Sequence, residues 1–133
     1  MVYSNSDWIQ AIAKLTEWTS RGKVTWNSTE DYANEDSESV KKAFESVVGS
    51  NRYVVKEVSR QEFYDSGPSD FYWQGPYYSF EVYQKIHNSL EYTHIATAPT
   101  GLPVVRDLFK KVVSAFAFQN GALDELLKQD VFD

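Results

Sequence analysis

The chain has 133 residues, of which 42% are hydrophobic, 24% charged and 16% aromatic, and a chain of this length normally folds as one domain, here over residues 1–133. The hydrophobic and charged fractions are close to globular averages, which excludes extensive disorder. The formal charge is -6 and the lysines and arginines are dispersed, so no nucleic-acid-binding face is expected, because such a face needs clustered positive charge.

An amphipathic helix is predicted over about Asp7–Ser20. Its apolar side chains recur at the spacing that places them on one helical face. They are Trp8, Ile12 and Leu15. Asn5 or Ser6 can cap the start of this helix, and Gly22 can take the left-handed conformation that often follows a helix end.

A short strand is predicted next, in the stretch Lys-Val-Thr-Trp, where Val24 and Trp26 would share one side. An acidic loop follows this strand. Its carboxylates are Glu30, Asp31, Glu35, Asp36 and Glu38. They do not form the alternating aspartate frame with glycine that a calcium loop requires, so no calcium site is expected.

A second helix is predicted over about Ser37–Val48, after the acidic loop. Its apolar stripe would consist of Val40, Phe44, Val47 and Val48. The acidic residues would lie in the first turn, where the helix dipole favours them, and Gly49 would end the helix.

Three strands are predicted after this helix. The β-branched stretch from Arg52 to Ser59 indicates the first, residues 77–86 the second and residues 90–97 the third. The turn between the last two would consist of His87, Asn88 and Ser89. Alternation in the second strand directs one set of side chains to the core, namely Tyr78, Phe80 and Val82.

The clearest helix pattern begins at Pro103, a residue that suits the first helical turn. Its apolar face consists of Val105, Leu108, Phe109, Val112 and Phe116. Asn120 and Gly121 interrupt the pattern, and a short Leu-rich helix follows. The predicted fold is therefore an α+β domain with an antiparallel sheet of about four strands, covered by the N-terminal and C-terminal helices.

Two stretches, LTEWTSRGKVTW and LFKKVVSAFAFQNGALDELLK, together cover about a quarter of the chain. They resemble the two ends of small bacterial and phage α+β proteins. Those proteins begin with a helix and a Gly-Lys-x-x-Trp strand and finish with a long helix and a short Leu-rich one. The resemblance implies a three-layer order of helix, sheet and helix, and it implies no activity and no functional residue.

Residues 63–83, FYDSGPSDFYWQGPYYSFEVY, are rich in aromatic side chains. Alternation directs at least one of three consecutive rings in a strand, here Phe71, Tyr72 and Trp73, towards solvent. Aromatic side chains are enriched in the cores of protein interfaces and among their energetically dominant residues. The segment therefore predicts binding of another protein or of a second copy of this chain. The predicted binding residues are Phe71, Tyr72, Trp73, Tyr77 and Tyr83.

The sequence offers little support for catalysis. It has no cysteine, which excludes thiolate nucleophiles, thiolate metal sites and disulfides and favours the cytoplasm. The two histidines, His87 and His94, lack the spacing of a metal site, and nucleotide-binding and hydrolase motifs are absent. No cofactor is therefore expected, and a non-enzymatic binding or regulatory protein is favoured over an enzyme.

A small-molecule-binding protein or a minor enzyme is the alternative. Its pocket would use the tyrosines of the aromatic segment together with His94, which lies in a predicted strand. No apolar stretch approaches the roughly 20 residues that a membrane helix needs, so no membrane contact is expected.

Overall fold

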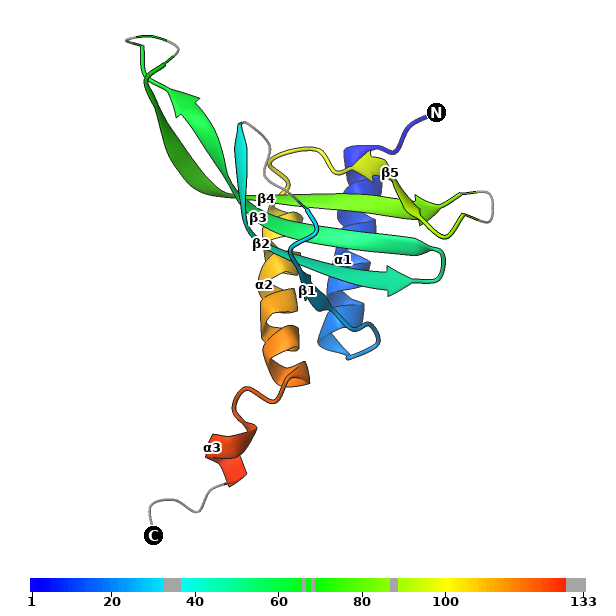
Figure 1. Ribbon diagram of the computed structural model, residues 1–133. Coiled ribbons are helices and arrows are strands. Elements are labelled where there is room, and N and C mark those ends of the chain that lie inside the picture. Colours follow the sequence, from blue (N-terminus) through cyan, green and yellow to red (C-terminus); the bar gives the residue numbers. More distant parts are fainter. Residues whose placement is uncertain (33–36, 66, 68, 87–88, 129–133) are drawn as a thin grey trace.

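The computed structural model describes residues 1–32, 37–65, 67, 69–86 and 89–128. In this part of the chain, helix α1 is followed by strands β1 to β5 and by helices α2 and α3 (Figure 1). The five strands form one antiparallel sheet in chain order. The predicted α+β class is confirmed, with five strands instead of about four.

Helix α1 spans Asn5–Ser20 and begins two residues before its predicted start. Its cap is Ser4, and not Asn5 or Ser6. The Ser4 hydroxyl accepts a hydrogen bond from the Asp7 N–H (3.1 Å), and the Asp7 carboxylate accepts one from the Ser4 N–H (2.8 Å). This reciprocal pair is a capping box, and it satisfies two donors that a helix start otherwise leaves open.

The connection from α1 to the sheet is fixed by Trp26, whose side chain is fully buried. Its indole N–H donates to the hydroxyl of Thr19 (3.0 Å). The side-chain amide of Gln119, at the end of α2, bonds both the N–H and the C=O of Trp26 (3.2 and 2.8 Å). Because these backbone groups are already occupied, β1 begins only afterwards and spans Asn27–Thr29. The strand predicted through Val24 is therefore displaced.

The helix predicted over Ser37–Val48 is wrong, because Glu38–Val48 form strand β2. The backbone of β2 pairs with β3 from Glu38 opposite Arg60 to Val48 opposite Asn51. The spacing of the apolar residues suits a helix, but the non-local pairing of a valine-rich segment overrides this local preference. Gly49, with φ of +64°, lies in the two-residue turn to the next strand.

Strands β3, β4 and β5 span Asn51–Phe63, Phe71–Lys85 and Tyr92–Thr97. Both β3 and β4 are longer than predicted, since they continue to pair beyond the end of their neighbours. The last residue of the turn predicted between β4 and β5, Ser89, lies between the two strands, and the other two, His87 and Asn88, lie outside the described residues.

A bulge interrupts the pairing of β3 with β4. Val58 lies opposite Tyr77 and Arg60 opposite Gln74, so Gly75 and Pro76 together face Ser59 alone. A side-chain carbon at position 75 would lie 3.0 Å from the carbonyl oxygen of Val58. Glycine is therefore the residue that allows this close approach, and proline at a bulge removes no ladder hydrogen bond.

Helices α2 and α3 span Pro103–Gln119 and Asp124–Lys128. Helices α1 and α2 lie on one face of the sheet, behind the strands in Figure 1. The buried cluster between the layers consists of Ile12, Leu15, Trp26, Phe44, Val55, Phe80, Ala98, Val105, Leu108, Phe109 and Val112. Tyr78 and Val82 pack against this cluster beside Phe80, as predicted. The described elements form two layers, whereas the resemblance implies three.

Candidate functional site

The distal ends of β3 and β4 leave the rest of the sheet as a two-stranded ribbon (Figure 1). Strand β2 pairs with β3 only as far as Arg60, with one further bond from the Gln61 N–H to the Ser37 carbonyl (2.9 Å). Strand β5 pairs with β4 only from Glu81 onwards. We call the described residues of this ribbon, within 61–74, the projecting hairpin.

Five aromatic side chains line the projecting hairpin, and between 41% and 53% of each residue is exposed. They are Phe63, Tyr64, Phe71, Tyr72 and Trp73. Because Phe63 pairs with Phe71 and Glu62 with Tyr72, alternation places the rings on both faces of the ribbon. One face carries Phe63, Phe71 and Trp73, and the other carries Tyr64 and Tyr72.

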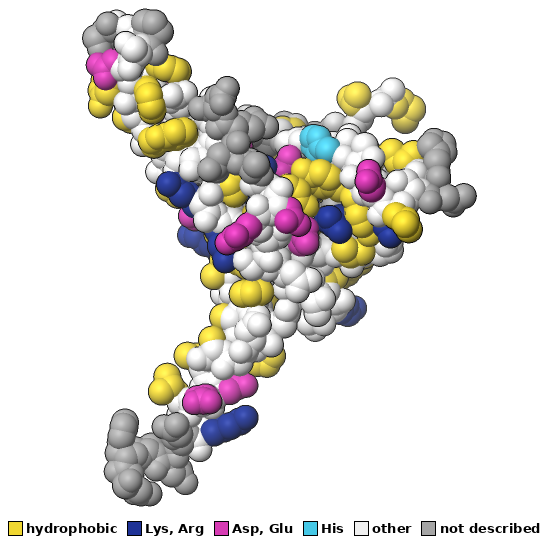
Figure 2. Space-filling model, viewed as in Figure 1, with side chains coloured by type: hydrophobic (Ala, Val, Ile, Leu, Met, Phe, Trp, Pro, Cys, Tyr) yellow, Lys and Arg dark blue, Asp and Glu magenta, His cyan; other side chains and the backbone are white. Residues whose placement is uncertain are grey.

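The rings on each face contact one another and not the buried cluster. The centroids of Phe71 and Trp73 are 5.9 Å apart at an interplanar angle of 89°. Those of Tyr64 and Tyr72 are 4.9 Å apart. Edge-to-face and tilted contacts of this kind are favourable for aromatic pairs. The projecting hairpin therefore presents two small, pre-arranged ring clusters to solvent. Figure 2 shows hydrophobic side chains at the surface of this part of the molecule.

Every charged side chain of the projecting hairpin is acidic, namely Glu62, Asp65 and Asp70. The nearest cation is Arg60 at its base. That guanidinium lies 4.5 Å from the centroid of Tyr77, and its Nε lies 3.7 Å from the Glu38 carboxylate. The aromatic surface is therefore bordered by negative charge.

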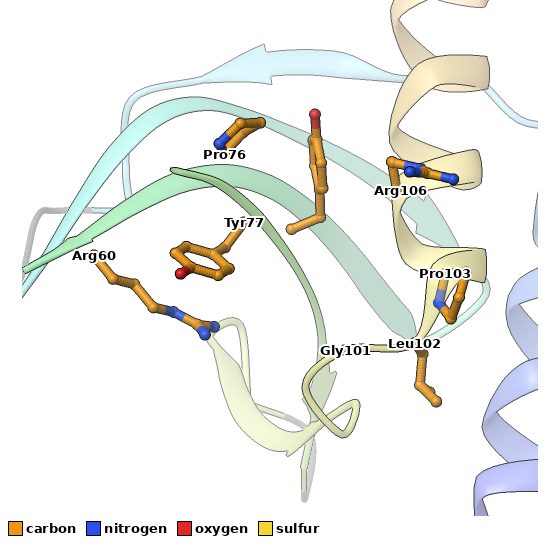
Figure 3. A pocket seen from close by; sticks show the side chains of 8 residues that line it. Arg60, Pro76, Tyr77, Gly101, Leu102, Pro103 and Arg106 are labelled. Atoms are coloured by element: carbon orange, nitrogen blue, oxygen red, sulfur yellow. The ribbon is translucent and has the colours of Figure 1, made fainter. Parts of the chain in front are cut away.

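Tyr77 is not part of this surface. It lines a separate pocket of about 280 Å³ beside the bulge, together with Arg60, Pro76 and the start of α2. Figure 3 shows its ring beside the side chain of Arg60, with Arg106 of α2 on the far side of the pocket. The cation–π contact with Arg60 ties the phenol ring to the base of the projecting hairpin and not to its aromatic clusters.

Tyr83 lies about 20 Å further along β4 than Tyr77, at 3.4 Å per residue. It is on the sheet face opposite the helices, where its ring lies 5.5 Å from that of Tyr32 and 5.1 Å from that of His94. Burial and the nearby carboxylate of Glu81 raise the pKa of Tyr83 to about 12. Tyr83 therefore stays a neutral phenol at physiological pH.

Tyr32 shares this environment, since burial and the carboxylate of Glu45 raise its pKa as well. Its hydroxyl donates to that carboxylate (3.1 Å). Glu81 in turn forms an ion pair with Lys56 (2.8 Å). The side chains of Glu81 and Lys56 are only 14% and 11% exposed. The His94 Nε2 lies 3.7 Å from Glu81 and 2.7 Å from the hydroxyl of Thr97. The side chain of His94 is 47% exposed, so it lies closer to solvent than those of Glu81 and Lys56.

The predicted binding residues are thus only partly brought together. Phe71, Tyr72 and Trp73 share the projecting hairpin, whereas Tyr77 and Tyr83 lie at two other places. Phe63 and Tyr64 belong to the predicted aromatic segment but were not among the predicted binding residues, because the preceding strand was predicted to end at Ser59. The signal that identifies them is the pair of aromatic runs on either side of a Ser/Gly/Pro/Asp segment, which is typical of a hairpin.

Within the described ranges, no group of three or more His, Cys, Asp and Glu side chains could hold a metal ion. No helix in that part of the chain is long and apolar enough to cross a membrane. Comparisons of the chain with protein-family models, curated proteins and solved structures find no match. The function is therefore argued from the geometry of the molecule.

Proposed function

We propose that this chain is a non-enzymatic protein-binding or regulatory domain, and that the projecting hairpin is the element that contacts its partner. The observation that supports this proposal is that five aromatic residues are about half exposed on a ribbon outside the buried cluster. Clusters of exposed apolar side chains mark interaction sites, and Trp and Tyr are over-represented among the residues that dominate binding energy.

The shape of the projecting hairpin points to a groove as the complementary surface. Rings lie on both faces of the ribbon, so a flat partner would bury only one of the two clusters. It would cover either the cluster of Phe63, Phe71 and Trp73 or the pair of Tyr64 and Tyr72. A groove that holds the ribbon on both sides would bury both clusters.

The charge of the projecting hairpin points to a basic partner. Its charged side chains are Glu62, Asp65 and Asp70, so a groove bordered by Lys or Arg would be electrostatically complementary. A second copy of the hairpin, or an anionic membrane surface, would bring like charges together. We therefore propose another protein as the partner, in the cytoplasm, which the lack of cysteine favours.

The partner can be captured by placing the photo-crosslinking residue p-benzoylphenylalanine at position 73 in the producing cells. The same substitution at Val113, which is 43% exposed on α2, is the matched control. We expect a discrete protein adduct from position 73 and none from position 113. Equal labelling from both positions would contradict a binding role for the hairpin.

The captured protein then allows a quantitative test with purified components. Trp73→Ala should weaken binding by roughly 30-fold or more, since an anchor ring contributes about 2 kcal/mol to binding. Its melting temperature should stay close to that of the parent, because the ring is outside the buried cluster. Glu62→Lys should also weaken binding, and less so at high salt.

Sedimentation of the Tyr72→Ala and Trp73→Ala variants distinguishes another protein from a second copy. We expect the parent and both variants to sediment as the same species. A parent dimer that both variants lose would show that the hairpin binds a second copy, contrary to the proposal.

A further inference from the structure

A cleft of about 490 Å³ lies between helix α1 and the helix-covered face of strands β3 to β5. Its walls are apolar and aromatic side chains with a few polar groups. The rings are those of Tyr3, of Trp8 and Trp18 from α1, of Tyr53 from β3 and of Phe80 from β4. Small-molecule sites in proteins typically have volumes of roughly 300–1,000 Å³ and walls of this composition.

The large rings explain why the cleft exists. Trp8 meets Phe80 edge-on, with centroids 6.3 Å apart and an interplanar angle of 80°. Tyr53 stacks on the same Phe80 ring at 5.8 Å and 15°. Helix α1 packs mainly against α2, and on its other side these rings lie between the helix and the strands.

The dimensions of the cleft suit an elongated or flat molecule. Trp8 and Trp18 are ten residues apart on one helix, which corresponds to about 15 Å along the helix axis. Both are only half-buried, so each has ring surface that a ligand can cover. The small side chains of Ala11 and Ala96 lie in the lining between the aromatic walls.

The polar groups of the cleft differ in how far they are already paired. The side chains of Asn51, Tyr53 and Gln84 bond one another at 2.9 and 3.1 Å. The Asp7 carboxylate is held in the capping box of α1. The ammonium of Lys14 lies 5.4 Å from the centroid of the Trp18 ring. Within the described part of the chain, no carboxylate oxygen lies within 4.0 Å of this ammonium. The cleft thus carries one cation without a counter-ion.

We propose that this cleft binds a flat, apolar small molecule that carries one anionic group. Its rings lie between the aromatic walls, and its anionic group pairs with Lys14. This site is separate from the projecting hairpin and does not depend on it, because the two share no residue.

The test uses two dyes of similar apolar surface, one anionic (1-anilinonaphthalene-8-sulfonate) and one neutral (N-phenyl-1-naphthylamine). We expect each to bind the folded parent at one saturable site with increased fluorescence. Ala11→Phe fills the cleft and should weaken both dyes by at least about tenfold, since a filled site must repack to admit a ligand. Ala13→Phe, an exposed position on the same helix that does not line the cleft, should bind as the parent does.

Lys14→Met tests the charge independently of the shape. It should weaken the anionic dye by about fivefold, corresponding to a charge pair of about 1 kcal/mol, and leave the neutral dye unchanged. Ala96→Leu blocks the cleft from the sheet side. It replaces Ala11→Phe as the test of the cleft if the Ala11→Phe variant does not fold.

Unchanged binding of both dyes to folded Ala11→Phe and Ala96→Leu would overturn the proposal. Equal loss of both dyes in Lys14→Met would overturn the role of the anionic group. Loss of dye binding in Trp73→Ala alone would locate the dye site on the projecting hairpin, which contradicts the cleft and leaves the proposed protein-binding role intact.

Discussion

Replacing Phe109 with alanine should lower the free energy of unfolding by about 3–5 kcal/mol, the usual cost of truncating an aromatic core residue. Phe109 is 6% exposed, and its ring lies 5.8 Å from that of Phe44 on β2 and 5.1 Å from that of Tyr78 on β4. The truncation would leave a cavity between α2 and two strands. Denaturant unfolding followed by circular dichroism measures the change.

Phe118→Ala is the matched control for this variant. Phe118 belongs to the same helix but is 87% exposed, so its truncation should change the unfolding free energy by less than about 0.5 kcal/mol. Equal stability of the Phe109 variant and the parent would show that α2 does not pack on the sheet as described.

Replacing Glu81 with glutamine should lower the free energy of unfolding by about 3 kcal/mol, because it leaves the ammonium of Lys56 nearly buried without a counter-charge. The two side chains lie 2.8 Å apart and are 14% and 11% exposed. The double variant Lys56→Met, Glu81→Leu should recover most of this loss, since an apolar pair of similar volume needs no compensation.

The exposed pair of Glu17 and Arg21, whose side chains are 55% and 62% exposed, provides the comparison. Glu17→Gln should cost less than about 1 kcal/mol, because solvent screens the charges. A similarly small cost for Glu81→Gln would indicate that the Lys56 ammonium reaches water. The sheet face opposite the helices would then be less compact than the structure shows.

The helices could be predicted from the sequence because their signals are local. The stripe of Leu108, Phe109 and Val112 is buried as predicted, and α2 begins at Pro103 and ends before Asn120 and Gly121. The start of α1 differs: the helix begins at Asn5 and not at Asp7, because Ser4 has the aspartate three residues ahead that a capping box needs.

Strand β2 could not be predicted, because the reasons for it are non-local. Val40, Phe44 and Val47 fit a helical stripe, and the acidic residues fit a helix start. In the structure, the carboxylates of Glu38 and Glu45 lie near Arg60 and Arg52 of the neighbouring strand instead. These partners are identified only once the register of β2 and β3 is known.

The candidate site was predicted only in part, because some of its features also depend on non-local contacts. Three consecutive rings in a strand cannot share one face, so exposure within Phe71–Trp73 follows from alternation alone. The separation of Tyr77 from these rings depends on the bulge at Gly75 and Pro76, and the cleft depends on contacts between α1 and β4. No local sequence pattern predicts the bulge or the cleft.

The central claim is that the projecting hairpin serves binding and not the fold. The most direct test is the unfolding free energy of a chain in which residues 62–72 are replaced by Asn-Gly. Gln61 and Trp73, which are paired, would then close a two-residue turn. We expect cooperative unfolding within about 1 kcal/mol of the parent, since the removed rings contribute nothing to the buried cluster. A loss of several kcal/mol, or of cooperativity, would show that the hairpin belongs to the core and would contradict the claim.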